Sequence, residues 1–213
     1  MGRLRILIAD DHAMICAGLQ KLLEPQHDVV GCVSDGRALL KMATELKPDV
    51  VLLDVGMPLL NGLDAGRELK RLIPDIKLIF LTMNPDSDLA TEAFRIGASA
   101  YLLKNSQAAE LLKAIHDAVR GISYVTPQIR LAMEEIFIRD PQALRRPKHL
   151  TDRQREVLQM LAEGCSMKEI AQVLQIKHRT VRFHKARIME ELAIETNSEL
   201  VQYAIKHGMI SAA

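Results

Sequence analysis

Short apolar runs alternate with longer segments of helical periodicity over the first 120 residues of the chain. The apolar runs cover residues 4–9, 28–34, 49–54, 76–82 and 100–103, and the helical segments cover 12–24, 36–46, 62–72, 87–96 and 106–120. Strands that alternate with helices in this way predict βαβ units and a parallel sheet. The apolar runs are continuous, which indicates a doubly wound sheet with helices on both faces.

The second part of the chain has a different pattern, without strand-like runs. Four helical segments follow Leu150, at residues 151–162, 167–174, 178–192 and 198–207. Residues 127–138 form one more short helical segment, and the sequence PQALRRPKH after it is typical of an exposed linker. We therefore expect an α/β domain over 1–122, a linker over 123–148 and a small all-α domain over 149–213.

The net charge of +1 conceals an uneven distribution. Residues 1–140 contain 16 basic and 19 acidic side chains, whereas residues 141–213 contain 12 and 8, so the two domains are expected to have different partners. The cysteines, Cys16, Cys32 and Cys165, include no CxxC pair and predict free thiols in a reducing cytoplasm. The first apolar run is too short for a signal peptide, and we expect no membrane-spanning segment.

Polar residues follow four of the predicted strands at their carboxyl ends. They are Asp10, Asp11, Asp54, Thr82 and Lys104. In an open parallel sheet these ends meet at one edge, which is where ligands bind. Asp54 ends the apolar run VVLLD, where a buried carboxylate is costly unless it is paired or lies at an opening. The three carboxylates, the hydroxyl and the ammonium are therefore expected to form one site.

This set of groups suits phosphoryl transfer. Clustered carboxylates repel one another unless a cation lies among them, and Mg²⁺ prefers oxygen ligands. An aspartate can act as a nucleophile and form an aspartyl-phosphate, whose negative charge Lys104 and the Thr82 hydroxyl would stabilise. The sequence therefore predicts Asp54 as the phosphoryl acceptor beside a Mg²⁺ site.

Each residue taken alone has a simpler explanation. Asp10 or Asp11 would serve as a helix cap, and Lys104 as a solvated surface charge. Their joint occurrence at four strand ends favours a site. An alternative function is an Asp-nucleophile phosphohydrolase for small molecules, but Gly56 stands where such an enzyme needs a second acid.

The basic region predicts a helix-turn-helix. A first helix that begins after Thr151 ends at Gly164, a short turn leads to KEIAQVL, and a basic helix follows. Residues 177–187 contain five Lys or Arg and no acid, which suits a helix in the DNA major groove better than a solvated face of mixed charge. Phe183 on this helix is either a core residue or a contact to a thymine methyl, and its polar neighbours favour the second.

The acid set, together with DVGMP, LTM and AYLLK, resembles the receiver domain of two-component response regulators over residues 3–121. The resemblance implies a flavodoxin-like fold with five strands in the order 2-1-3-4-5. It implies phosphorylation of Asp54, and Mg²⁺ bound by Asp10, Asp11 and the Gly56 carbonyl. It also implies that Thr82 and Tyr101 reorient on phosphorylation. Asn84-Pro85 is less typical of the family and stiffens the loop after Thr82.

The stretches LTDRQREVLQMLAEG, KEIAQVL and TVRFHKARIMEEL closely resemble the LuxR-type helix-turn-helix of the NarL/FixJ class over residues 148–210. The resemblance implies that Thr180–Arg187 enter the major groove and that the last helix pairs two DNA-binding domains. The candidate DNA contacts are Lys177, Arg179, Thr180, Arg182, Phe183, His184, Lys185 and Arg187. Two residues depart from the family pattern: Lys177 replaces a helix-capping Ser, and Ala193 replaces a Gly.

Together the two halves predict a transcription factor of a two-component system, and not an enzyme. The expected partners are a sensor histidine kinase, which phosphorylates Asp54, and promoter DNA, bound as a homodimer; RNA polymerase is a further candidate partner. A constitutive DNA-binding protein, whose receiver serves only for dimerisation, is the alternative that the intact acid set opposes.

Overall fold

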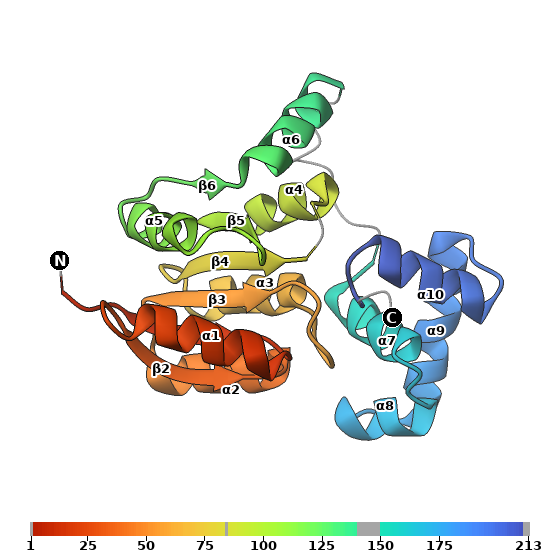
Figure 1. The fold of residues 1–213 in the computed structure, drawn as a ribbon. Coiled ribbons are helices and arrows are strands. Elements are labelled where there is room, and N and C mark those ends of the chain that lie inside the picture. Colours follow the sequence, from red (N-terminus) through yellow and green to blue (C-terminus); the bar gives the residue numbers. More distant parts are fainter. Residues whose placement is uncertain (1, 84, 140–149, 211–213) are drawn as a thin grey trace.

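A parallel sheet with helices on both faces forms the first part of the molecule (Figure 1). The computed structural model describes residues 2–83, 85–139 and 150–210. Its strands are β1 (Arg5–Ala9), β2 (Asp28–Val33), β3 (Val50–Asp54), β4 (Lys77–Thr82), β5 (Ala100–Leu103) and β6 (Tyr124–Val125), in the spatial order β2-β1-β3-β4-β5-β6. All neighbouring strands are parallel, so their carboxyl ends form one edge.

The helices divide between the two faces of the sheet. They are α1 (Ala13–Leu23), α2 (Gly36–Leu46), α3 (Gly62–Leu72), α4 (Ser87–Ile96) and α5 (Ala108–Val119). The cores place α1 and α5 on one face and α2, α3 and α4 on the other. The alternating βα pattern and the doubly wound topology expected from the sequence are confirmed, and every predicted helix bound lies within two residues of the observed one.

The sheet has six strands where the sequence predicted five. Tyr124 and Val125 pair in parallel with Ala100 and Tyr101 of β5. This strand was not predicted because two residues are too few to show a periodic pattern of apolar positions. The strand leads into α6 (Pro127–Arg139), whose Ile129 and Met133 complete the core on the α4 side.

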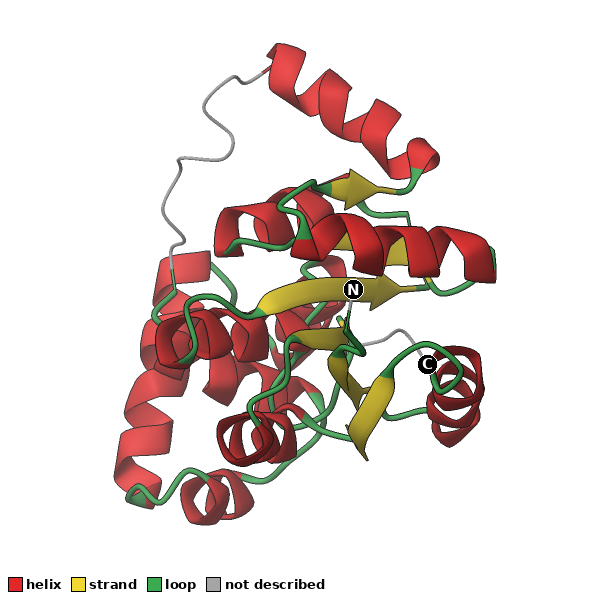
Figure 2. Ribbon diagram, turned by 90° about the vertical axis from the view of Figure 1, so that its left-hand side faces the viewer, coloured by secondary structure: helices red, strands yellow, loops and turns green. Residues whose placement is uncertain are grey.

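The second part of the described chain is a helical domain with its own core. It contains α7 (Asp152–Ala162), α8 (Met167–Val173), α9 (His178–Leu192) and α10 (Asn197–Lys206). Thr151 is the N-cap of α7, where the sequence placed the start of this helix, and it forms a capping box with Gln154. Figures 1 and 2 show this domain beside the carboxyl-terminal edge of the sheet. Among the described residues, no helix is both long and apolar enough to cross a bilayer.

Candidate functional site

The three acids expected at the sheet edge lie together. Asp10 and Asp11 follow β1, and Asp54 is the last residue of β3, the strand beside it. Oxygen atoms of these carboxylates and a ring nitrogen of His12 all lie within 4.8 Å of one another. Asp10 and Asp54 are buried, whereas Asp11 and His12 are exposed at the rim. Oxygen donors at this spacing suit a hard divalent cation.

Lys104 enters the same site from the end of β5. Its ammonium lies 2.8 Å from Oδ2 of Asp10 and 3.0 Å from Oδ2 of Asp54. Burial lowers the pKa of Lys104, but the hydrogen bond to Asp10 and the attraction of Asp54 outweigh it and leave the pKa raised. Burial raises the pKa of Asp54, and Lys104 offsets part of that shift. Lys104 therefore favours the charged form of Asp54, against the larger effect of burial.

Thr82 and Tyr101 lie on β4 and β5, next to this cluster. Thr82 is buried at the end of β4, and its carbonyl accepts a hydrogen bond from the Lys104 amide at 2.7 Å. Tyr101 is fully buried, and its ring packs on Phe80 and in the core that α6 completes. Burial raises the pKa of Tyr101, an effect that the Thr82 hydroxyl partly offsets. The two residues are therefore neighbours, and the tyrosine is turned inward.

The basic helix α9 presents its charges to solvent. Val181 and Ile188 are completely buried against the rest of the helical domain, in agreement with the inward stripe of the sequence. Phe183 is 62% exposed, so the core alternative for this residue is wrong. The other candidate DNA contacts are exposed or partly exposed; they are Lys177, Arg179, Thr180, Arg182, His184, Lys185 and Arg187.

The two residues that depart from the family pattern, Lys177 and Ala193, lie at the two ends of α9. Lys177 occupies the N-cap without a side-chain hydrogen bond to the helix. Ala193 adopts the left-handed conformation at the C-cap, with φ of 52°, where glycine carries no steric cost. The ends of α9 are therefore less stabilised than a Ser and a Gly would make them.

Comparison with known proteins decides the family. Residues 6–116 match the response regulator receiver domain, and residues 148–204 match the bacterial regulatory proteins of the luxR family. This chain is a LuxR-family response regulator. It is 35% identical to the response regulator GacA of Pseudomonas aeruginosa, over 99% of each chain. It is 32% identical to the transcriptional regulatory protein DegU of Brevibacillus brevis, over 98% of this chain and 96% of DegU.

Solved structures agree with this assignment. The RcsB protein from Salmonella enterica serovar Typhimurium, bound to promoter P1flhDC with the phosphomimetic BeF3⁻, is 28% identical. The structural alignment covers 95% of this chain and 98% of the RcsB chain, with a TM-score of 0.63. The response regulator is thus a receiver joined to a LuxR-type DNA-binding domain, and its relatives are transcription regulators.

In this response regulator, α7 of the DNA-binding domain packs against the loop that follows Asp54. Gln159 is completely buried there. Its side-chain nitrogen donates to the Met57 carbonyl at 2.8 Å, and its oxygen accepts from the Asn61 amide at 2.8 Å. Arg155, one turn earlier, is also buried and pairs with Asp64 at 2.6 Å. Helix α7 of the DNA-binding domain therefore forms polar contacts with both ends of this receiver loop.

The end of the DNA-binding domain reaches the cluster of carboxylates around Asp54. Ile205, Gly208 and Ile210 line a cavity of about 120 Å³ together with Asp54 and Lys104. Gly208 has φ of +60°, and a Cβ there would lie 2.6 Å from the side chain of Leu89, so the approach of this turn to α4 requires glycine. The DNA-binding domain thus restricts the space in front of the Asp54 carboxylate.

The interface residues Arg155 and Gln159 were not predicted from the sequence. Arg155 and Gln159 lie four residues apart on one side of α7, away from Val157 and Leu158, which pack in the core of the helical domain. Polar residues on such a face are usually solvated, and the sequence contains no signal that distinguishes these two. Their burial depends on how the two domains pack, which the sequence pattern of one helix does not encode.

Proposed function

We propose that the protein accepts a phosphoryl group on Asp54 and uses it to control the binding of promoter DNA. The observation that carries the proposal is the position of Asp54, a buried carboxylate at a strand end, 3.0 Å from Lys104 and next to Asp10 and Asp11. The family assignment supports the same chemistry. The domains that perform the two tasks are residues 1–122 and 149–213, joined by 123–148.

The residues at this edge fit a Mg²⁺ ion. Asp10, Asp11, Asp54 and the Gly56 main-chain carbonyl would hold it, because all of them offer oxygen and the carboxylates already lie within one coordination sphere of each other. The ion would neutralise charge on the transferred group. Lys104 already lies between Asp10 and Asp54, so it lowers the repulsion between these acids before the ion binds.

The chain's own residues account for the transfer step. A carboxylate oxygen of Asp54 attacks phosphorus, the bond from phosphorus to the donor breaks, and the donor leaves with the bonding electrons. Lys104 then pairs with a phosphoryl oxygen, and the Thr82 hydroxyl donates to another. Because Tyr101 is the buried neighbour of Thr82, a shift of the threonine changes the packing that Tyr101 shares with α4 and α6.

We further propose that phosphorylation weakens the docking of the DNA-binding domain. A phosphoryl group on Asp54 must enter the cavity that is lined by Ile205, Gly208 and Ile210 of the DNA-binding domain. Mg²⁺ would bind the loop after Asp54, to which Gln159 is hydrogen-bonded. A coupling free energy of about 1–3 kcal/mol is enough for a useful switch. The released domain would bind DNA as a homodimer through α9, with α10 pairing the two copies.

The partners follow from this function. A sensor histidine kinase would donate the phosphoryl group, double-stranded promoter DNA would be the target, and RNA polymerase is a candidate at the promoter. Because its partner is DNA, the protein would act in the cytoplasm. RcsB is recorded on promoter DNA with a phosphomimetic, which supports DNA binding by the phosphorylated form here.

Intact-protein mass after incubation with Mg²⁺ and acetyl phosphate tests the phosphoryl step. Wild type is expected to gain one phosphoryl group, and Asp54→Asn none. An equal gain in the variant would place the acceptor elsewhere. Continued turnover of acetyl phosphate, many equivalents per protein without a lasting adduct, would favour the phosphohydrolase alternative instead.

A further inference from the structure

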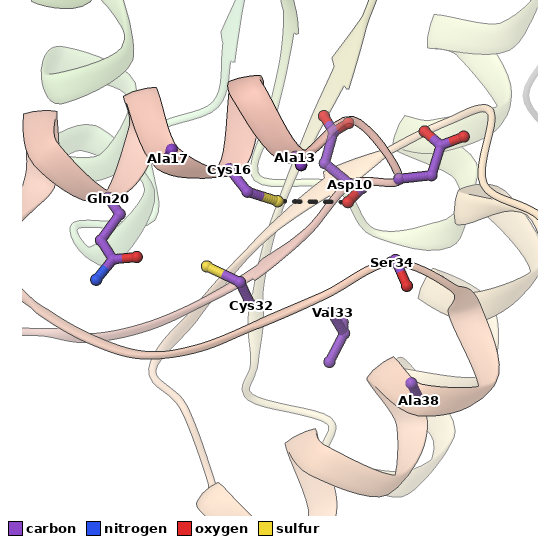
Figure 3. Close-up of a pocket in the computed structure, with 10 residues that line it drawn as sticks. Asp10, Ala13, Cys16, Ala17, Gln20, Cys32, Val33, Ser34 and Ala38 are labelled. Atoms are coloured by element: carbon purple, nitrogen blue, oxygen red, sulfur yellow. Dashed lines mark hydrogen bonds between the residues drawn. The ribbon is translucent and has the colours of Figure 1, made fainter.

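Two cavities border the carboxylates at the sheet edge, and they differ in the acid that they reach. The larger has a volume of about 560 Å³, with the free cysteines Cys16 and Cys32 on its walls (Figure 3). Asp10 borders this cavity, but Asp54 and Lys104 are not among the described residues that line it. The smaller cavity, of about 120 Å³, is lined by both Asp54 and Lys104. Of these two cavities, the smaller one therefore gives a phosphodonor contact with Asp54.

The outer part of the smaller cavity is apolar, and the DNA-binding domain supplies much of it. Ile205 of α10 and Ile210 in the turn after α10 both line the cavity, as does Met83 of the receiver. Ile205 is 40% exposed and Met83 is 65% exposed, whereas Asp54 is 5% exposed. The buried acceptor therefore lies at the bottom of the cavity, and the apolar side chains lie near its mouth.

The geometry of phosphoryl transfer makes this mouth part of the donor site. The attacking and leaving oxygens lie in line, on opposite sides of phosphorus. When a carboxylate oxygen of Asp54 attacks, the bond to the leaving group breaks on the far side of phosphorus, and the leaving group departs with the bonding electrons. Asp54 ends β3, and the DNA-binding domain lies beyond that end of the sheet (Figure 1). The leaving group must therefore occupy the space between the acceptor and Ile205 and Ile210.

The volume of the cavity limits the size of that leaving group. Water occupies about 30 Å³ in the liquid, so the cavity has the volume of about four water molecules. A single benzene ring fills a protein cavity of about 150 Å³. A phosphoryl group with a few further atoms therefore fits in front of Asp54. A donor whose leaving group contains an aromatic ring does not fit there unless the DNA-binding domain moves.

We propose that Ile205 and Ile210 determine which phosphodonors Asp54 accepts, and that they restrict the docked protein to small acyl phosphates and phosphoramidates. The inference rests on the proposed function, in which Asp54 is the phosphoryl acceptor. A phosphohistidine carried on a folded kinase domain is larger than any of these donors, so it reaches Asp54 when the DNA-binding domain has moved away. The docked form thus accepts small donors, and the undocked form accepts both classes.

Acetyl phosphate and benzoyl phosphate are the matched probes, because both are acyl phosphates and they differ in the size of the leaving carboxylate. Intact-protein mass measures the initial rate of phosphorylation of the full-length protein by each donor in the presence of Mg²⁺. The ratio of the benzoyl rate to the acetyl rate is the readout. Ile205→Ala shortens a side chain at the mouth, and Arg155→Met loosens the docked interface. Each is expected to raise this ratio about tenfold or more above wild type, since one methylene in an apolar pocket changes discrimination by about 10- to 200-fold.

Val173→Ala is the matched control. Val173 is an apolar residue of the same domain with similar exposure, 38%, but it lies on α8 and does not line the cavity. Its ratio is expected to equal that of wild type, and a rise would overturn the inference. Equal ratios in wild type, Ile205→Ala and Arg155→Met, with a mass gain from acetyl phosphate, would overturn the size limit and leave Asp54 as the acceptor. Absence of any mass gain with both donors would overturn the proposed function, and this inference with it.

Discussion

Gln159 of the DNA-binding domain donates a hydrogen bond to the main-chain carbonyl of Met57, three residues after Asp54, at 2.8 Å. The Gln159 side chain is completely buried and also accepts from Asn61, where α3 begins. Hydrogen bonds of a buried amide are costly to lose. The loop beside the phosphoryl site and the output domain therefore share one polar network, in which a change at either end affects the other.

Breaking the docked interface is expected to increase DNA binding without phosphorylation. Arg155→Met removes the buried partner of Asp64, while Arg67 still pairs with that carboxylate. We expect about 5- to 150-fold tighter binding of duplex DNA by the unphosphorylated variant, which is the range of a typical coupling free energy. Fluorescence anisotropy with labelled DNA measures the affinity, and small-angle scattering measures the separation of the domains.

Arg153→Met is the control for this prediction. It removes the same charge from the same helix, but Arg153 bonds to Glu156 and to the Leu174 carbonyl within its own domain. It is expected to leave the scattering profile unchanged. Unchanged DNA affinity and unchanged scattering for Arg155→Met would contradict a docked state that restrains DNA binding.

Phe183 and Ile188 are predicted to act differently although both are apolar residues of α9. Phe183→Ala removes an exposed ring and is expected to change the free energy of unfolding by less than about 0.5 kcal/mol while weakening DNA binding. Ile188→Ala empties a buried site and is expected to cost about 2–5 kcal/mol. Denaturant unfolding and anisotropy titrations check both. A destabilised Phe183→Ala protein would show that the ring packs in a core.

Ala193→Gly is expected to stabilise the DNA-binding domain by about 1 kcal/mol. Ala193 adopts φ of 52° at the end of α9, a conformation that costs a residue with a Cβ about 1–2 kcal/mol. Denaturant unfolding followed by circular dichroism measures the gain. Ala186→Gly, in the middle of the same helix, is the control and is expected to destabilise by about 1 kcal/mol. Equal losses for both variants would rule out the left-handed cap.

Asp54 is expected to make stability depend on pH when Mg²⁺ is absent. Its pKa is raised in the folded protein, so the folded state binds the proton more tightly than the unfolded chain does. The free energy of unfolding is therefore expected to fall as pH rises from the pKa of Asp54 in the unfolded chain to its higher pKa in the folded protein, because the carboxyl group becomes charged in a buried position. Asp54→Asn is expected to be more stable than wild type at pH 7, with a difference that shrinks as pH falls toward about 4. Parallel curves for the two proteins across this interval would contradict it.

The sequence predicted the alternating strands and helices of a parallel sheet because each strand is a continuous apolar run and each helix has its own periodicity, whereas the strand order followed only from the resemblance to receiver domains. Asp54, Asp10 and Lys104 were predicted to meet because parallel strands bring their carboxyl ends to one edge. In the structure, both carboxylates lie within hydrogen-bonding distance of the Lys104 ammonium. Strand β6 was missed because two residues carry no pattern. Gln159 was missed because a polar residue on a polar helix face is buried only by the neighbouring domain.

The affinity of wild type and Asp54→Asn for duplex DNA, each with and without acetyl phosphate and Mg²⁺, tests the central claim most directly. Phosphodonor is expected to tighten DNA binding by wild type at least fivefold and to leave Asp54→Asn unchanged, since only wild type carries the acceptor carboxylate. Equal affinities of wild type with and without phosphodonor, under conditions where its mass shows the phosphoryl group, would contradict the account and favour constitutive DNA binding.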